Sequence, residues 1–147
     1  MSLEIFFLFF LNFAFLNPIL HELAHAGMAI FFGYKINFIK LGSPVVFNSR
    51  HLKLAPFFIV SYTNFDNIDD IRPRDFMWIA MAGPFVDISL FLLFFITINS
   101  SCHIGSDGFF MALCASFINL MAFLININIL IPGSDGHQTW KAYLKIK

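Results

Sequence analysis

The pentapeptide His21-Glu22-Leu23-Ala24-His25 lies inside a long apolar run, from Leu3 to Gly33, and constrains this chain more than any other stretch. On a helix, residues four apart share one face, so both imidazoles can reach a single metal ion. Glu22 lies about 100° further round the helix, where it can hold a metal-bound water. An ionisable side chain in a membrane span costs roughly 2.5–3.5 kcal/mol on insertion scales. Three such side chains within five apolar-flanked residues are therefore expected to bind something.

The H-E-x-x-H spacing is typical of zinc peptidases, which use the two histidines as ligands and the glutamate as general base. A catalytic zinc site usually has three protein ligands and one open position. Glu4 and Glu22 are the only glutamates, so a downstream glutamate ligand is excluded. Met28 and Phe31 stand where a metzincin would have its glycine and third histidine. The third ligand must therefore be an aspartate, or a histidine elsewhere in the chain.

Composition places the chain among membrane proteins. Of its 147 residues, 59% are hydrophobic, 22 are phenylalanine and only 12% are charged, with a mean hydropathy of +0.77. The length predicts a single domain, 1–147. Net charge is zero and no basic patch carries interleaved aromatics, which argues against nucleic acid as a partner. Cys102 and Cys114 lack metal-ligand spacing, and a disulfide between them is not expected.

The pattern predicts a membrane α-helical fold with three transmembrane helices, at about 3–33, 76–98 and 109–131. The first run lacks a basic start and continues into the histidine motif, so we interpret it as a retained span and not as a signal peptide. Pro18 is expected to kink this span. Asn17 would either cap the helix that restarts there or support the imidazole of His21, and the cap is favoured.

A β-rich segment, 36–62, separates the first two spans, and its strands are too short to cross a bilayer. It is interpreted as a membrane-associated hairpin or small sheet. Two roles stay open for it: a plain surface hairpin, or an edge strand that receives an extended peptide. A polar connector follows from Asp66 to Asp75, and the third span is followed by a short tail from Gln138 to Lys147.

Depth along the helices ranks the candidates for the third ligand. His21 lies ~27 Å along the first helix from Leu3, and the third span is ~33 Å long, which brings the turn after it to the level of the histidines. Asp135 in that turn is favoured, and His103 falls at the opposite face. The other candidates are His51, His137, Asp87 and the loop aspartates. His137 and Asp87 are kept in reserve, although a lone aspartate in a span is more often a packing or hydrogen-bonding group.

Three motifs together resemble the site-2 protease family of intramembrane zinc metalloproteases. H-E-L-A-H (21–25) matches its first motif, A-G-P-F-V-D (82–87) resembles its A-G-P-x-x-N, and N-I-L-I-P-G-S-D-G (128–136) is similar to its N-x-x-P…D-G element. F-G-Y-K and L-G-S-P (32–35 and 41–44) also resemble the segment after the first motif. The likeness covers most of the chain, as a minimal three-span core without a PDZ module. Two departures are Asp87 in place of asparagine and Asn128 four residues before Pro132 instead of three.

The resemblance implies a ligand set, a cofactor and a reaction. His21, His25 and Asp135 would hold one Zn²⁺, and Glu22 would activate a zinc-bound water. Asn17, Asp87 and Asn128 would support the ligands or contact substrate. The substrate would be a membrane protein or peptide, cut in or near its transmembrane segment within the lipid bilayer. The alternatives are a catalytically silent membrane module that binds a partner's transmembrane helix, and a metal carrier.

Charge distribution predicts a multi-pass protein of the cell membrane. Basic residues occur only between the first two spans and after the third, which the positive-inside rule places on the cytoplasmic side. The N-terminus is then outside, the C-terminus is cytoplasmic, and the active site faces the cytoplasmic half. The nine basic residues are Lys35, Lys40, Arg50, Lys53, Arg72, Arg74, Lys141, Lys145 and Lys147.

Overall fold

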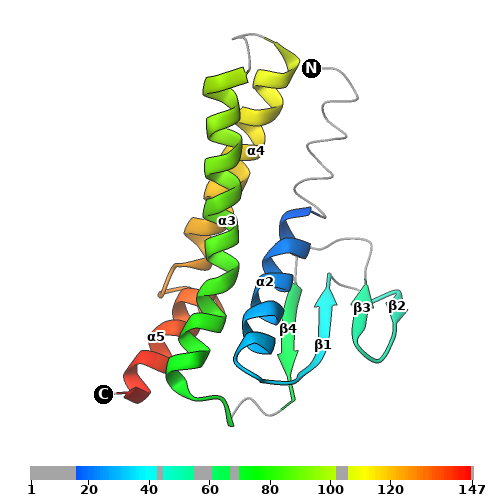
Figure 1. The fold of residues 1–147 in the computed structure, drawn as a ribbon, viewed down its shortest axis with the longest axis vertical. Coiled ribbons are helices and arrows are strands. Elements are labelled where there is room, and N and C mark those ends of the chain that lie inside the picture. The colour runs from blue at the N-terminus through cyan, green and yellow to red at the C-terminus, as the bar shows by residue number, and fades with distance from the viewer. Residues whose placement is uncertain (1–15, 43–44, 55–60, 67–69, 102–105, 147) are drawn as a thin grey trace.

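The structure is a computed structural model that describes residues 16–42, 45–54, 61–66, 70–101 and 106–146 (Figure 1). Over these residues the protein is mostly helical, with four helices and one small mixed sheet. The elements, in chain order, are α2 (Asn17–Phe31), β1 (Ile36–Leu41), β2 (Phe47–Asn48), β3 (Leu52–Leu54), β4 (Ser61–Phe65), α3 (Pro73–Ser101), α4 (Asp107–Asn126) and α5 (Asp135–Ile146).

Helix α2 carries the histidine motif. Pro18 lies in its first turn, where the missing N–H would have no intrahelical partner. The helix closes at Gly33, whose φ of 84° is the left-handed conformation that glycine favours, and the Tyr34 N–H donates to the Ala29 carbonyl at 2.9 Å. Residues 3–15 of the expected first span lie outside the described residues. The kink expected at Pro18 therefore stays a prediction.

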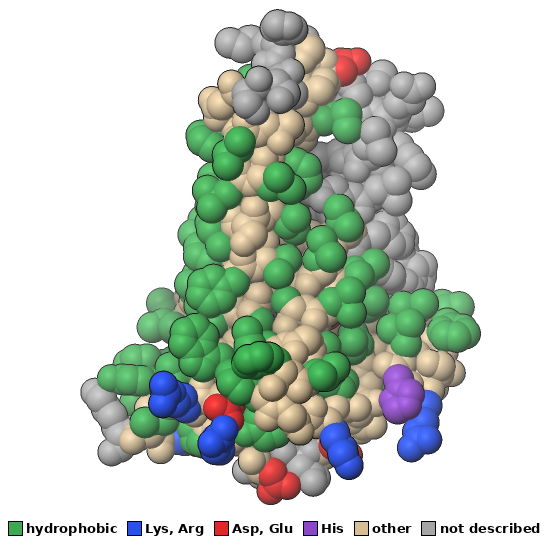
Figure 2. All heavy atoms as spheres, viewed as in Figure 1, with side chains coloured by type: hydrophobic (Ala, Val, Ile, Leu, Met, Phe, Trp, Pro, Cys, Tyr) green, Lys and Arg blue, Asp and Glu red, His purple; other side chains and the backbone are tan. Residues whose placement is uncertain are grey.

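Helices α3 and α4 are both long and apolar enough to cross a membrane. Helix α3 runs beyond the expected 76–98 at both ends, to Pro73 and Ser101. Helix α4 begins at a cap in which Ser106 Oγ accepts from the Phe109 N–H at 3.1 Å. Large apolar side chains stay exposed along both helices, as expected of a lipid-facing surface (Figure 2). They include Phe85, Leu92, Leu93, Phe95, Ile96, Phe110, Leu113, Phe117, Leu124 and Ile125.

The expected end of the third span at Ile131 is wrong, because α4 stops at Asn126. Turns follow in which the Asn128 side-chain oxygen accepts from the Leu130 N–H at 2.9 Å, and Gly133 has a φ of 90°. The expected tail 138–147 is also wrong, since α5 forms from Asp135 and packs against α3. Its second residue is glycine because a Cβ there would clash with the Ile127 carbonyl.

The sheet has the order β2-β3-β1-β4, with β1 parallel to β3 and antiparallel to β4. The expected hairpin or small sheet is thus a small sheet of four strands, and it extends to Phe65 instead of ending at residue 62. Of the expected β-rich segment 36–62, residues 43–44 and 55–60 lie outside the described residues. Strand β4 is an edge strand and lies against α2 (Figure 1). Lys and Arg side chains gather at the end of the molecule that holds the sheet and α5 (Figure 2).

Helix α3 is the centre of the helical packing, in contact with α2, α4 and α5. Small side chains let the helices approach closely, as in membrane bundles. Six buried alanines serve this packing: Ala26, Ala29, Ala80, Ala82, Ala112 and Ala115. An apolar cluster of Ala29, Ile71 and Ile79 lies below the histidine motif. The closely packed helices bring polar side chains from distant parts of the chain into one buried region.

Candidate metal centre

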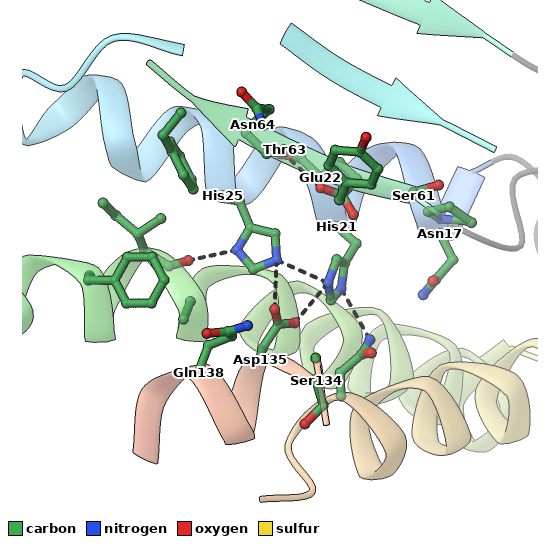
Figure 3. A pocket seen from close by; sticks show the side chains of 18 residues that line it. Asn17, His21, Glu22, His25, Ser61, Thr63, Asn64, Ser134, Asp135 and Gln138 are labelled. Atoms are coloured by element: carbon green, nitrogen blue, oxygen red, sulfur yellow. Dashed lines mark hydrogen bonds and ion pairs between the residues drawn. The ribbon is translucent and has the colours of Figure 1, made fainter. Parts of the chain in front are cut away.

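Three potential metal ligands converge where α2, α3 and α5 meet (Figure 3). The Nε2 atoms of His21 and His25 lie 3.1 Å apart. The Asp135 carboxylate, at the start of α5, places Oδ2 3.1 Å from His21 Nε2 and Oδ1 3.4 Å from His25 Nε2. Both histidines are buried, as the four-residue spacing on α2 turns them to the same face. His21, His25 and Asp135 thus form a group that could hold a metal ion.

The other nitrogen of each imidazole is already engaged. His21 Nδ1 lies 3.0 Å from Asp87 Oδ2, and His25 Nδ1 lies 2.7 Å from the carbonyl oxygen of Ile79. Carboxylate and carbonyl oxygens only accept, so each Nδ1 must carry the proton. The Nε2 atoms then present lone pairs, which is the tautomer that a metal-binding histidine needs.

The distances fit a tetrahedral metal. The two Nε2 atoms lie 3.1 Å apart, and each faces a different oxygen of the Asp135 carboxylate at 3.1 or 3.4 Å, an arrangement that needs positive charge among the three side chains. Additional ring protons would leave two N–H bonds aimed at each other, whereas a single cation satisfies all three side chains. Ligand atoms at zinc's usual bond lengths of 2.0–2.1 Å lie about 3.3 Å from one another in a tetrahedron, close to the separation of the two nitrogens. Two imidazoles and one carboxylate are a donor set that zinc accepts.

Gly83 lets α3 approach the imidazoles. A Cβ at this position would lie 2.5 Å from His21 Nε2, His21 Cε1 and His25 Nε2. No side chain fits there without moving a ring. The glycine is followed by the fully buried Pro84, and together they lie on the part of α3 that faces the centre.

Glu22 lies on the β4 side of the centre and is buried (Figure 3). The Thr63 hydroxyl, on β4, is 2.8 Å from Glu22 Oε2 and 3.2 Å from the Glu22 carbonyl oxygen. Its one proton can go to either acceptor. Thr63 therefore fixes the Glu22 carboxylate and ties the edge strand to the metal-binding helix.

A cavity of about 440 Å³ opens over these groups. Strand β4 forms one wall, while α2, α3 and the start of α5 supply the others. The cavity holds the three ligands together with Glu22, so a reacting group inside it could meet all of them.

The Asp135 carboxylate is suited to binding a cation. Burial alone would raise the pKa of this carboxyl group, but in the metal-free site the hydrogen bonds and positive charge of protonated His21 and His25 outweigh burial and hold the pKa below its usual value. Asp135 is consequently expected to be ionised near neutral pH, as a metal ligand must be.

The structure separates the other candidates. His51 is exposed on the sheet, and His137 Nδ1 lies 2.9 Å from the Ile129 carbonyl oxygen, outside the lining of the cavity. His103 lies outside the described residues. The favoured interpretation of Asn17 as a helix cap is wrong, because its buried side chain donates to Asp87 Oδ1 at 3.0 Å instead.

Several residues near the centre had not been singled out from sequence. Asn126 lines the cavity and donates to Asp87 Oδ2 at 3.0 Å, whereas Asn128 serves the turn after α4. A polar residue in an apolar run was a usable signal for Asn126 and for Asn119, which is fully buried. Thr63 offered no such signal, since its role depends on how the sheet lies against α2.

No model of a known protein family matches the chain. A search of curated proteins likewise finds no match.

Proposed function

We propose that this chain is an intramembrane zinc metalloprotease of the site-2 protease kind, which hydrolyses a peptide bond in or near a transmembrane segment. The observation that carries the proposal is the convergence of His21, His25 and Asp135 beside Glu22 in one cavity. A protein that only stores metal would not need Glu22, a carboxylate that lines the cavity but does not belong to the ligand group. Two of the three motifs that resemble this family supply these four side chains: H-E-L-A-H supplies His21, Glu22 and His25, and the element at 128–136 supplies Asp135.

His21, His25 and Asp135 would hold the zinc ion. Zinc, when bound, polarises the scissile carbonyl and lowers the pKa of a coordinated water. The protein's own residues fix the ligands: Asp87 and the Ile79 carbonyl hold the two rings from behind.

Glu22 is the general base and then the general acid. It takes a proton from the attacking water as the oxygen adds to the carbonyl carbon. It returns that proton to the amine nitrogen as the C–N bond breaks, so no proton is gained or lost overall. Thr63 holds the Glu22 carboxylate on the cavity side during both transfers.

The substrate is an unwound stretch of a transmembrane helix, because an intact helix keeps its carbonyls hydrogen-bonded internally. Strand β4 borders the cavity and is the edge of the sheet, so its outer side offers backbone groups for one more strand. Of the two roles left open by the sequence, this position favours the edge strand that receives a peptide.

The protein crosses the membrane three times, through a first span that includes α2 and through α3 and α4. Lys and Arg side chains at the sheet end support a cytoplasmic location for that end (Figure 2). Ser49→Cys and Asn99→Cys, in a Cys102→Ser, Cys114→Ser background, test this. An impermeant reagent should label Asn99→Cys in intact cells and Ser49→Cys only after lysis. Labelling of Ser49→Cys in intact cells would reverse the topology.

Glu22→Gln tests the reaction. Membranes that contain wild-type or Glu22→Gln protein are compared by mass spectrometry for new peptide termini. Loss of a general base typically lowers the rate by 10²–10⁴-fold, so termini that depend on the wild-type protein should vanish. The purified variant should keep one zinc per chain, because Glu22 is not a ligand.

Two results would count against this function. If Glu22→Gln keeps full cleavage, Glu22 is not the base. If the wild-type protein binds zinc yet generates no new termini, a module that binds a partner helix or a metal carrier explains the chain better. Zinc flux in proteoliposomes that is unaffected by Glu22→Gln would then identify the carrier.

A further inference from the structure

Asp87 is a fully buried carboxylate in the middle of the apolar helix α3. Among the described residues it has no Lys or Arg partner. Three donors converge on it instead, each at 3.0 Å: Asn17 Nδ2 reaches Oδ1, while Asn126 Nδ2 and His21 Nδ1 reach Oδ2. A buried charge in this setting is costly unless something offsets it.

The donors come from two helices, α2 and α4, so the carboxylate of α3 is held from both of its neighbours. Asn17 belongs to α2 and Asn126 ends α4. Asn17 Nδ2 also donates to Asn119 Oδ1 at 2.6 Å, and Asn119 Nδ2 donates to the Ala115 carbonyl oxygen at 2.7 Å. The amides are neutral, so they orient Asp87 without neutralising it. Of the hydrogen-bond partners of Asp87 within the described residues, His21 alone also faces the metal centre, through its Nε2.

We propose that Asp87 is a positioning residue that increases the metal affinity of the centre through His21. It holds His21 with the proton on Nδ1, which leaves the Nε2 lone pair directed at the metal. Its negative charge also attracts the cation through His21, since the Asp135 carboxylate offsets only one of the two charges of a divalent ion. This role rests on the metal centre of the proposed function.

The two ligand histidines thus depend on different kinds of group. His25 Nδ1 donates to the Ile79 backbone carbonyl, which contributes no charge. His21 Nδ1 donates to a side chain that carries one. A substitution that removes the charge but keeps the shape should therefore weaken the centre through His21 alone.

Asp87→Asn is that substitution, and Asp75→Asn is its matched control. Asp75 is a second buried carboxylate on α3, bonded to Tyr34 and Arg72 rather than to a ligand histidine. Zinc affinity is measured on the purified full chain by competition with a chromogenic chelator. Loss of a partner behind a metal ligand typically costs 10–100-fold in affinity, and we expect a loss in this range for Asp87→Asn. Asp75→Asn should match the wild type.

Two further readouts separate positioning from a general structural role. The melting temperature of the metal-free Asp87→Asn protein should stay near that of the wild type, while the increase on adding zinc becomes smaller. The visible absorption of the Co²⁺-substituted protein should change in Asp87→Asn and not in Asp75→Asn. Zinc affinity and Co²⁺ spectrum both equal to wild type in Asp87→Asn would overturn the proposal.

A measurement on the wild-type protein keeps the test available if Asp87→Asn does not fold. In protein labelled with ¹⁵N-histidine and loaded with ¹¹³Cd²⁺, the metal coupling should appear on Nε2 of two imidazoles whose Nδ1 atoms keep their protons. Coupling through Nδ1 would overturn the proposal.

If the wild-type chain binds neither zinc nor cadmium, the metal centre itself is wrong, and the proposed function fails together with this inference. Metal binding without proteolysis would overturn the proposed function and support the role of Asp87.

Discussion

Helix α3 carries two buried carboxylates that are used in opposite ways. Asp75 accepts from the Tyr34 hydroxyl and from Arg72 Nε, both at 2.7 Å, and the Arg72 side chain is 76% exposed. Asp87, about 18 Å further along the helix, is fully buried and is held by amides and a histidine. The first carboxylate has a cation that reaches solvent, whereas the second does not.

The comparison teaches that the role of a buried polar group depends on where its hydrogen bonds end. Those of Asp75 end at Tyr34 and Arg72, which tie the segment after α2 to the start of α3. Those of Asp87 end at an imidazole whose other nitrogen faces the cavity. Changes around Asp75 should therefore alter stability, and changes around Asp87 should alter metal binding.

Removal of a ligand should have the largest effect. His21→Ala, His25→Ala and Asp135→Ala should each lower zinc affinity by more than about 100-fold, the upper cost of losing an outer partner. Metal analysis after gel filtration should find no stoichiometric zinc. His51→Ala and His137→Ala should retain it. If Asp135→Ala keeps zinc while His137→Ala loses it, the third ligand has been misassigned.

Gly83→Ala should have the next largest effect, because its Cβ would lie 2.5 Å from both ligand rings. We expect at least about a tenfold loss of zinc affinity as the rings shift. Gly27→Ala on α2 is the control, since a Cβ there meets nothing within 4 Å. The control should bind zinc normally and gain helix stability of up to about 1 kcal/mol. Normal zinc binding by Gly83→Ala would contradict the observed ring positions.

The hydrogen bond from the Thr63 hydroxyl to the Glu22 carboxylate can be compared with the one from the Tyr34 hydroxyl to Asp75. Thr63→Val removes the donor to Glu22 and should lower kcat about 10–100-fold, in line with about 1.5–3 kcal/mol for a hydrogen bond to a charged group. Zinc content should not change. Thr63→Ser keeps the hydroxyl and should restore most of the rate. Equal activity of the valine and serine variants would show that Glu22 needs no such support.

Tyr34→Phe should have the smallest effect and act on stability alone. The hydroxyl donates to Asp75 and accepts from the Arg72 N–H at 3.2 Å. Its loss should lower the free energy of unfolding by about 1–2 kcal/mol, measured by thermal denaturation in detergent. Zinc affinity should equal that of the wild type. A drop in zinc affinity would mean that the two carboxylate clusters on α3 are coupled.

The sequence predicted a residue's position correctly where that position depends on a single helix or on the length of a single span. Four-residue spacing puts His21 and His25 on one face of any helix, and the depth estimate favoured Asp135. The apolar runs predicted the two helices that could cross a membrane, although α4 ends five residues before Ile131.

Contacts between distant segments were harder to predict. Asn17 is 70 residues from Asp87 and 102 from Asn119, so its partners depend on how three helices cross. Local rules therefore favoured a helix cap. Thr63 reaches Glu22 only because β4 lies against α2, and Gly83 is required only because two rings pack on α3.

The Asp135 contact also has a consequence for the ends of the fold. His21 and Asp135 are 114 residues apart, and they belong to the first and last helices that the structure describes. An ion held between them would be a cross-link that closes most of the chain into a loop. In the chain-entropy account, such a closure stabilises a folded protein by about 4–5 kcal/mol. A chelator should then expose the C-terminal helix to proteases, so the metal proposed for hydrolysis would also keep the chain closed.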